Sequence, residues 1–245
     1  MRRVSVRFIG ISTLALGVAA CAVPQQTAVA PPPPPPAKVE LAAPNEYYFN
    51  MVLPVRNEDG TFVTPNTGIG PVDQLFHFRS AVNVAALSCR TMAGMNMVED
   101  YNLFLKKWKN TLAKANNEIE SRFVKAASTS RAGKRNRDAH MTDLYNHFAR
   151  PTTLPTFCPA AKRHLQAANA LPDKSEALHT YSQQALPQLE GIFQDHFAEI
   201  HDYQVSYREQ MMKAGKTPPP LPRTVVAPES PVIDADAASD VAAAG

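Results

Sequence analysis

The sequence lacks the motifs that most often mark catalysis or a bound cofactor. It has no G-x-S-x-G elbow or Ser-x-x-Lys pair for a nucleophile, no C-x-x-C-H run for covalent haem, and no glycine-rich loop for phosphate. No segment repeats with a period of about 20–50 residues, which argues against a solenoid. An enzyme with an unfamiliar site stays open as the alternative, and the leading hypothesis is a non-catalytic binding or scaffold protein.

Cysteine is scarce, with three in 245 residues, and the first follows a targeting segment. Arg2, Arg3 and Arg7 precede an apolar run that ends at Ala20. This run is too short to cross a bilayer, which takes about 20 apolar residues. The motif Val18-Ala19-Ala20-Cys21 resembles the lipobox of bacterial lipoprotein signal peptides.

The resemblance covers residues 1–21 only and implies that residues 1–20 are removed and Cys21 is acylated. It therefore implies a lipid-anchored protein of the cell envelope that faces the periplasm, with the outer membrane as the expected location. The alternative is an ordinary secretory signal cut after Ala28-Val29-Ala30. Pro31 follows that site directly, and signal peptidases tolerate proline there poorly.

Excess charge of either sign is missing once the signal is removed. The whole chain has 25 Lys and Arg against 22 Asp and Glu. Three of the basic residues lie within residues 1–20, which contain no acid, so the remainder balances at 22 against 22. The basic character of the full sequence therefore belongs to targeting, and a nucleic-acid partner is not expected.

The two remaining cysteines, Cys89 and Cys158, form an even pair in an oxidising compartment. A bridge between them would close a loop of about 70 residues, which contributes on the order of 4 kcal/mol in the chain-entropy model. The alternative is two buried thiols. We predict the disulfide.

Proline divides the chain into segments. Residues 21–44 include six consecutive prolines, Pro31 to Pro36, and predict a stiff polyproline II linker. Residues 216–245 are rich in proline and alanine and predict a disordered tail. The folded domain is expected at residues 45–215.

Apolar residues within that domain recur with helical spacing. We predict an all-α, up-and-down bundle of four to six helices, with a short hairpin over residues 47–64 in front of it. The expected helices run from Pro71 to Met92, from Asn96 to about residue 127, from about residue 131 to Phe148, from near Pro159, and from Asp173 with a break or kink at Pro187. Asn96 with Glu99, and Asp173 with Glu176, have capping-box spacing. The run Ala81–Cys89 resembles segments of small exported bacterial proteins without an assigned function, which implies nothing about activity.

A basic stretch is the clearest functional signal in this sequence. Between residues 122 and 137 six basic residues occur without an acid, namely Arg122, Lys125, Arg131, Lys134, Arg135 and Arg137. Between residues 187 and 202 four acids occur without Lys or Arg. The plain interpretation is two solvated faces that pair with each other. The functional one is a surface for anionic lipid or lipopolysaccharide phosphates.

Metal binding is the weakest of the hypotheses. His140, Asp143 and His147 share one helix face, as do His196 and Glu199, but di-metal bundles pair Glu-x-x-His motifs with further inward glutamates. Met92, Met95 and Met97 crowd one turn and could hold copper, although methionine also fills gaps between helices. No cofactor is expected. If the protein does bind copper or another metal, these residues are the candidate ligands.

Overall fold

Helices account for nearly all the regular structure of residues 41–222, the part of the chain that the computed structural model describes. These residues fall in one compact unit. The all-α prediction is confirmed. The predicted signal peptide, Cys21, and most of the proline-rich linker and tail lie outside the described residues.

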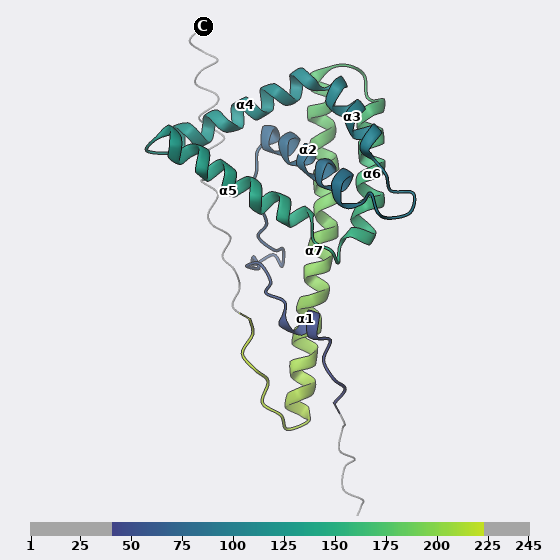
Figure 1. Ribbon diagram of the computed structural model, residues 1–245. Coiled ribbons are helices and arrows are strands. Elements are labelled where there is room, and N and C mark those ends of the chain that lie inside the picture. The colour runs from purple at the N-terminus through teal and green to yellow at the C-terminus, as the bar shows by residue number, and fades with distance from the viewer. Residues whose placement is uncertain (1–40, 223–245) are drawn as a thin grey trace, which may run out of the picture. The chain divides into compact units, whose positions relative to one another are not determined.

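Seven helices follow one another in this range (Figure 1). They are α1 (Glu46–Asn50), α2 (Pro71–Ser88), α3 (Val98–Lys107), α4 (Lys109–Ala126), α5 (Ser130–Phe148), α6 (Leu154–Ala170) and α7 (Ser175–Lys213). None of the helices in residues 41–222 is long and apolar enough to cross a membrane.

Helix α2 forms the centre of the bundle and packs against α3, α4, α5, α6 and α7. Its sequence explains this position, because Arg79 is the only formal charge between Gln74 and Cys89. Ten of its 18 residues are buried. An apolar stripe on one face would suit a surface helix, whereas α2 is apolar on most of its circumference and is therefore enclosed.

The predicted second helix is interrupted at Trp108, which separates α3 from α4. The Trp108 ring is buried and its Nε1 donates to the carbonyl of Ala168 at 3.2 Å. The expected capping box is wrong as well, because the Asn96 side chain accepts from Val98 N and the helix shows no side-chain N-cap bond. Tertiary packing of the tryptophan thus overrides a continuous helical pattern.

Helices α4 and α5 form an antiparallel hairpin that projects from the other helices (Figure 1). Thr129 caps α5 by accepting from Ala132 N. Gly133 is buried where the helices meet, and a Cβ built there would lie 2.5 Å from the Cα of Val124. Only glycine permits this close approach, so the geometry of the hairpin depends on Gly133.

Two prolines that were expected to begin or interrupt a helix, Pro159 and Pro187, lie inside helices. Helix α6 begins at Leu154, five residues before the predicted Pro159, which lies inside it. Helix α7 continues through Pro187 over 39 residues, so the first of the two predicted alternatives there, a break or a kink, is wrong. The first turn of α7 lacks the expected Asp173 cap. At 1.5 Å per residue, α7 is about 58 Å long.

The segment before α2 is only partly a hairpin. Arg56 and Phe62 form an isolated antiparallel bridge around a turn in which Gly60 has φ +88°. Residues 47–50, which the predicted hairpin included, instead belong to the helix α1. Helix α1 packs against the distal part of α7, where Gln204 Nε2 donates to the carbonyls of Tyr48 and Met51.

The Cys89–Cys158 disulfide is present and joins the C-terminal end of α2 to α6. Both cysteines are fully buried, and their Cα atoms lie 5.8 Å apart. The predicted disulfide between Cys89 and Cys158 is confirmed.

Candidate functional site

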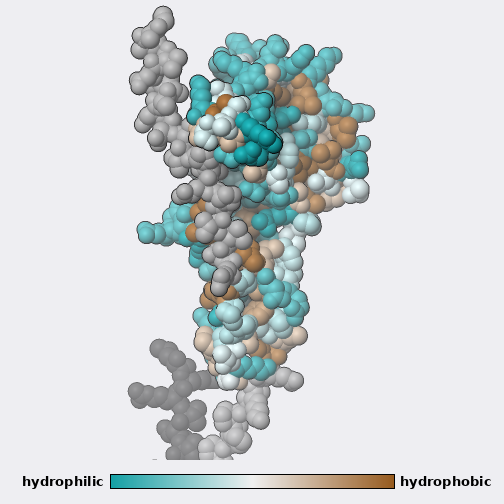
Figure 2. All heavy atoms as spheres, turned by 60° about the vertical axis from the view of Figure 1, so that its left-hand side comes forward, coloured by the Kyte–Doolittle hydropathy of each residue, from teal (hydrophilic) through white to brown (hydrophobic). Residues whose placement is uncertain are grey.

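The basic stretch occupies the projecting end of the α4–α5 hairpin. Four of its six members are exposed there, namely Lys125, Arg131, Lys134 and Arg135, and we call these four residues the basic tip. Figure 2, which turns this side of the molecule forward, shows mainly hydrophilic residues at the projecting end. Within residues 41–222 the tip forms one ion pair, a long one of 3.7 Å between Lys134 and the partly exposed Glu120.

The other two basic residues serve the bundle rather than an open surface. Arg122 donates to both carboxylate oxygens of Asp73 in α2, at 2.8 and 2.6 Å. Arg137 donates to Asn116 Oδ1 at 2.8 Å and lies 3.7 Å from Asp138. Both are half-buried and engaged within the hairpin or with α2, which leaves them less available to an outside surface than the other four.

The acidic stretch does not pair with the basic one in residues 41–222. Each ion pair of the basic residues goes to Asp73, Glu120 or Asp138, none of which belongs to residues 187–202. The plain interpretation, that the two stretches neutralise each other, is therefore not what the described residues show.

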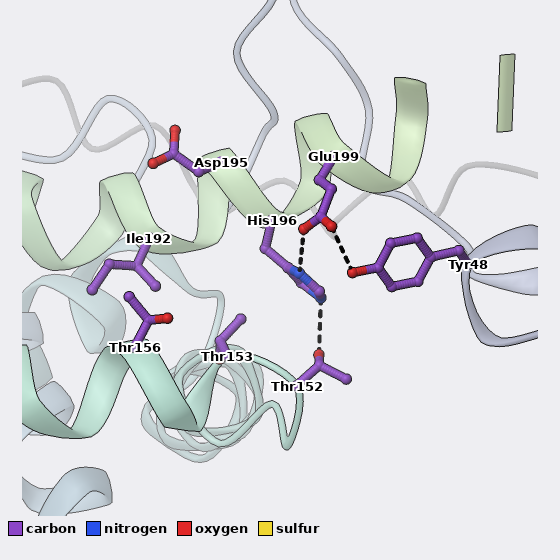
Figure 3. A pocket seen from close by; sticks show the side chains of 8 residues that line it. All are labelled: Tyr48, Thr152, Thr153, Thr156, Ile192, Asp195, His196 and Glu199. Atoms are coloured by element: carbon purple, nitrogen blue, oxygen red, sulfur yellow. Dashed lines mark hydrogen bonds and ion pairs between the residues drawn. The ribbon is translucent and has the colours of Figure 1, made fainter. Parts of the chain in front are cut away.

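A pocket of about 380 Å³ lies between α7, the start of α6 and α1 (Figure 3). All but one of its lining residues have a polar side chain: they are Tyr48, Thr152, Thr153, Thr156, Ile192, Asp195, His196 and Glu199. No Lys or Arg belongs to this lining. The pocket therefore suits a small polar ligand without a negative charge.

Three hydrogen bonds and one longer contact connect the side chains along one wall of the pocket. The Tyr48 hydroxyl donates to Glu199 Oε1 at 3.0 Å, and Glu199 Oε2 lies 3.9 Å from His196 Nδ1. The other ring nitrogen, His196 Nε2, lies 2.9 Å from Thr152 Oγ1, which is also 2.9 Å from the Tyr47 hydroxyl. In Figure 3 the imidazole lies between the carboxylate and the threonine.

The His196 ring is protected from solvent, with its side chain 10% exposed, whereas Glu199 is 62% exposed. Burial lowers the pKa of His196 below its ordinary 6.5, Glu199 raises it, and Arg150 lowers it again. The ring is therefore neutral at neutral pH. Burial and the hydrogen bond to Glu199 both raise the pKa of Tyr48, so its hydroxyl keeps its proton and donates.

A second polar cluster is buried inside the bundle. Glu190 of α7 accepts from Thr64 Oγ1 at 2.8 Å and from Asn66 Nδ2 at 2.6 Å, and it lies 2.8 Å from His147 Nε2. Asn66 continues the cluster to His77 Nδ1 at 2.8 Å, and His77 Nε2 lies 3.0 Å from His140 Nε2. The cluster fastens the segment before α2 onto three helices.

Protonation in this cluster is set by burial and by its partners. Burial, and then the charges of His140, His147 and Arg122, hold the pKa of His77 well below 6.5. Burial raises the pKa of Glu190, but the hydrogen bonds from His147, Asn66 and Thr64 outweigh it, and the net result is a lowered pKa. The cluster therefore contains a neutral His77 and an ionised Glu190 at neutral pH.

The predicted metal ligands go to separate places. His140 lies against His77, His147 against Glu190, and His196 against Thr152. Across residues 41–222 no group of three or more His, Cys, Asp or Glu side chains could hold a metal ion. Met97 is buried in the core, and Met92 and Met95 pack against it, which is the gap-filling role that methionine has between helices.

Comparison of the chain with protein-family models finds no match, and comparisons with curated proteins and with solved structures find none either. Function is therefore argued from the residues of this chain alone.

Sequence reasoning missed Thr152, Tyr48 and His77. Thr152 and His196 are 44 positions apart, and Tyr48 and Glu199 are 151 apart. No motif marks such distant pairs. His77 was detectable as a polar residue within the apolar run of α2, which is where a buried polar group needs a partner.

Proposed function

We propose that this chain is a lipid-anchored module of the bacterial cell envelope that binds anionic surfaces through the basic tip of its α4–α5 hairpin. The observation that carries the proposal is the exposure of Lys125, Arg131, Lys134 and Arg135 together at the projecting end of this hairpin. No acid occurs between residues 121 and 137. The anchor and the envelope location rest on the lipobox-like motif at Cys21.

The expected ligands carry phosphate groups, as lipid headgroups and lipopolysaccharide do. Each Lys or Arg near an anionic membrane contributes about 1 kcal/mol, within a Debye length of about 8 Å at physiological salt. Two or three simultaneous contacts would contribute about 2–3 kcal/mol by the same measure. At physiological salt this attraction serves to orient a domain that a lipid already holds nearby. At low salt, where the Debye length grows to about 30 Å at 0.01 M, the same contacts should also bind the acyl-free domain.

The test uses the chain from residue 22 onward, without an acyl group, mixed with anionic or neutral vesicles. We expect binding to anionic vesicles at low salt and its loss by roughly 0.5 M salt, where screening shortens the reach of each charge. Reversing Lys125, Arg131, Lys134 and Arg135 to Glu should abolish binding. Arg122 and Arg137 are left unchanged because they bond within the fold. Equal binding to neutral vesicles would contradict the proposal.

A further inference from the structure

The pocket at the start of α6 has the parts of a nucleophilic site. A hydroxyl, Thr152 Oγ1, lies within hydrogen-bond distance of an imidazole nitrogen, and a carboxylate lies on the far side of the same ring. A hydroxyl acts as a nucleophile when an adjacent base takes its proton and a third group orients that base. These three groups border an open volume of about 380 Å³, which leaves room for a substrate.

The direction of the hydrogen bonds agrees with this role. The ionised Glu199 can only accept, which favours the proton of His196 on Nδ1. Nε2 then offers its lone pair, and the Thr152 hydroxyl donates to it at 2.9 Å. Thr152 Oγ1 in turn accepts from the Tyr47 hydroxyl, also at 2.9 Å. This arrangement satisfies the hydroxyls of Thr152 and Tyr47 and the Nε2 of His196, and it points Nδ1 toward the Glu199 carboxylate at 3.9 Å.

We propose that Thr152, His196 and Glu199 form an acyl-transfer centre that hydrolyses small, uncharged carboxylic esters, an activity beyond surface binding. The Nδ1-to-carboxylate distance of 3.9 Å is long for a hydrogen bond. Catalytic hydrogen bonds are often long in the empty enzyme and tighten when substrate binds.

The reaction has two balanced halves. Thr152 Oγ1 attacks the ester carbonyl carbon while His196 Nε2 takes the hydroxyl proton, and the ester C–O bond then breaks as the leaving alcohol oxygen receives that proton from Nε2. The product of this half is acyl-Thr152 and the alcohol. Water attacks the acyl carbon next and gives a proton to Nε2. The bond between the acyl carbon and Thr152 Oγ1 then breaks as Nε2 returns that proton to Oγ1, which releases the carboxylic acid and restores Thr152.

The remaining lining sets the substrate class. Thr153 and Thr156 offer hydroxyls, and Ile192 offers one apolar contact. Glu199 lies on the lining beside His196 and disfavours an anionic acyl group there, while Arg150, whose charge also acts on His196, is not part of the lining. The volume is near the lower end of the roughly 300–1,000 Å³ of ligand sites, which limits the substrate to a small ester.

The test measures release of 4-nitrophenol from 4-nitrophenyl acetate by the purified exported protein. Thr152→Val leaves every imidazole in place, and it should lower kcat/KM by about a hundredfold or more if His196 acts as the base for this hydroxyl. Thr152→Ser should keep activity. Peptide mass spectrometry should find an acetyl group on Thr152. His201→Gln, which removes a half-buried imidazole outside the pocket, should have no effect.

Two results separate this role from a structural one. Thr152 is exposed, so Thr152→Val should leave the thermal midpoint unchanged while activity falls. The pH profile of kcat/KM should show a base that titrates below 6.5, in the direction that burial moves His196. Equal activity of Thr152→Val and wild type, or no acetyl group on Thr152, would overturn the proposal.

Discussion

Replacing Gly133 with alanine should destabilise the protein, although helix propensity alone predicts the opposite. Alanine in a helix interior is favoured over glycine by roughly 0.5–1 kcal/mol. A Cβ at this position would, however, lie 2.5 Å from the Cα of Val124 and 2.6 Å from the carbonyl oxygen of Phe123. Both atoms belong to the backbone of α4, so the two helices must separate.

Forcing extra volume into a packed contact costs about 1–3 kcal/mol. After the gain in propensity, we expect Gly133→Ala to lower the free energy of unfolding by about 1–2 kcal/mol. For a domain of this size, each kcal/mol lowers the melting temperature by about 2–4 °C. Urea unfolding followed by circular dichroism at 222 nm, a wavelength that reports roughly on helix content, gives the free energy when the slope is unchanged.

Gly191 in α7 provides the matched control. Nothing lies within 4 Å of a Cβ built at Gly191, so alanine there gains propensity without a clash. Gly191→Ala should raise the free energy of unfolding by about 0.5–1 kcal/mol. If Gly133→Ala also stabilised the protein, the close approach of α4 and α5 would be refuted.

Three further predictions concern pH, the disulfide and the anchor. Because the pKa of His77 is lowered in the folded protein, His77 takes up a proton at a higher pH in the unfolded chain than in the folded one. The free energy of unfolding should therefore decrease as the pH falls below 6.5. The lowered pKa of Glu190 should remove more stability below pH 4.5. Equal free energies of unfolding in urea at pH 7 and pH 5 would contradict the His77 prediction, and equal values at about pH 5 and about pH 3 would contradict the Glu190 prediction. Reduction of Cys89–Cys158 should cost about 4 kcal/mol and slow migration on a gel, whereas alkylation of both cysteines without reductant would refute the bridge. Cys21→Ala should move the protein to the soluble fraction or leave it unprocessed, and a mature wild-type terminus beyond residue 30 without an acyl mass would contradict the anchor.

Helix class and much of the core were predictable because apolar spacing is a local property of the sequence. Leu75, Phe78 and Val82 mark the buried face of α2, and all three are fully buried. The interruption at Trp108 was not predictable in this way, because it depends on the carbonyl of Ala168, which lies 60 positions away. Continuation of α7 through Pro187 likewise depends on packing along the whole helix, which outweighs one lost backbone bond.

The candidate sites also differ in how much of each could be predicted, because local patterns are visible in the sequence and contacts between distant residues are not. The basic tip is a run in the sequence, so its charge was visible at once, but the two internal pairs of Arg122 and Arg137 needed the fold. The pocket was only half visible, since His196 and Glu199 share a helix turn. Thr152 reaches them from the start of α6, and its position there follows from how α6 packs on α7.

Two charge-reversal variants compared in one vesicle flotation assay test most directly whether the basic tip binds anionic membranes. The first changes Lys125, Arg131, Lys134 and Arg135 to Glu, and the second changes four exposed cations away from the hairpin, Arg90, Lys174, Lys213 and Lys216, to Glu. Both variants alter net charge by the same amount, so a difference between them reports position rather than charge. We predict that only the first variant stops floating with anionic vesicles at low salt. Equal loss of binding in both variants would show that overall charge, and not the basic tip, attracts the protein.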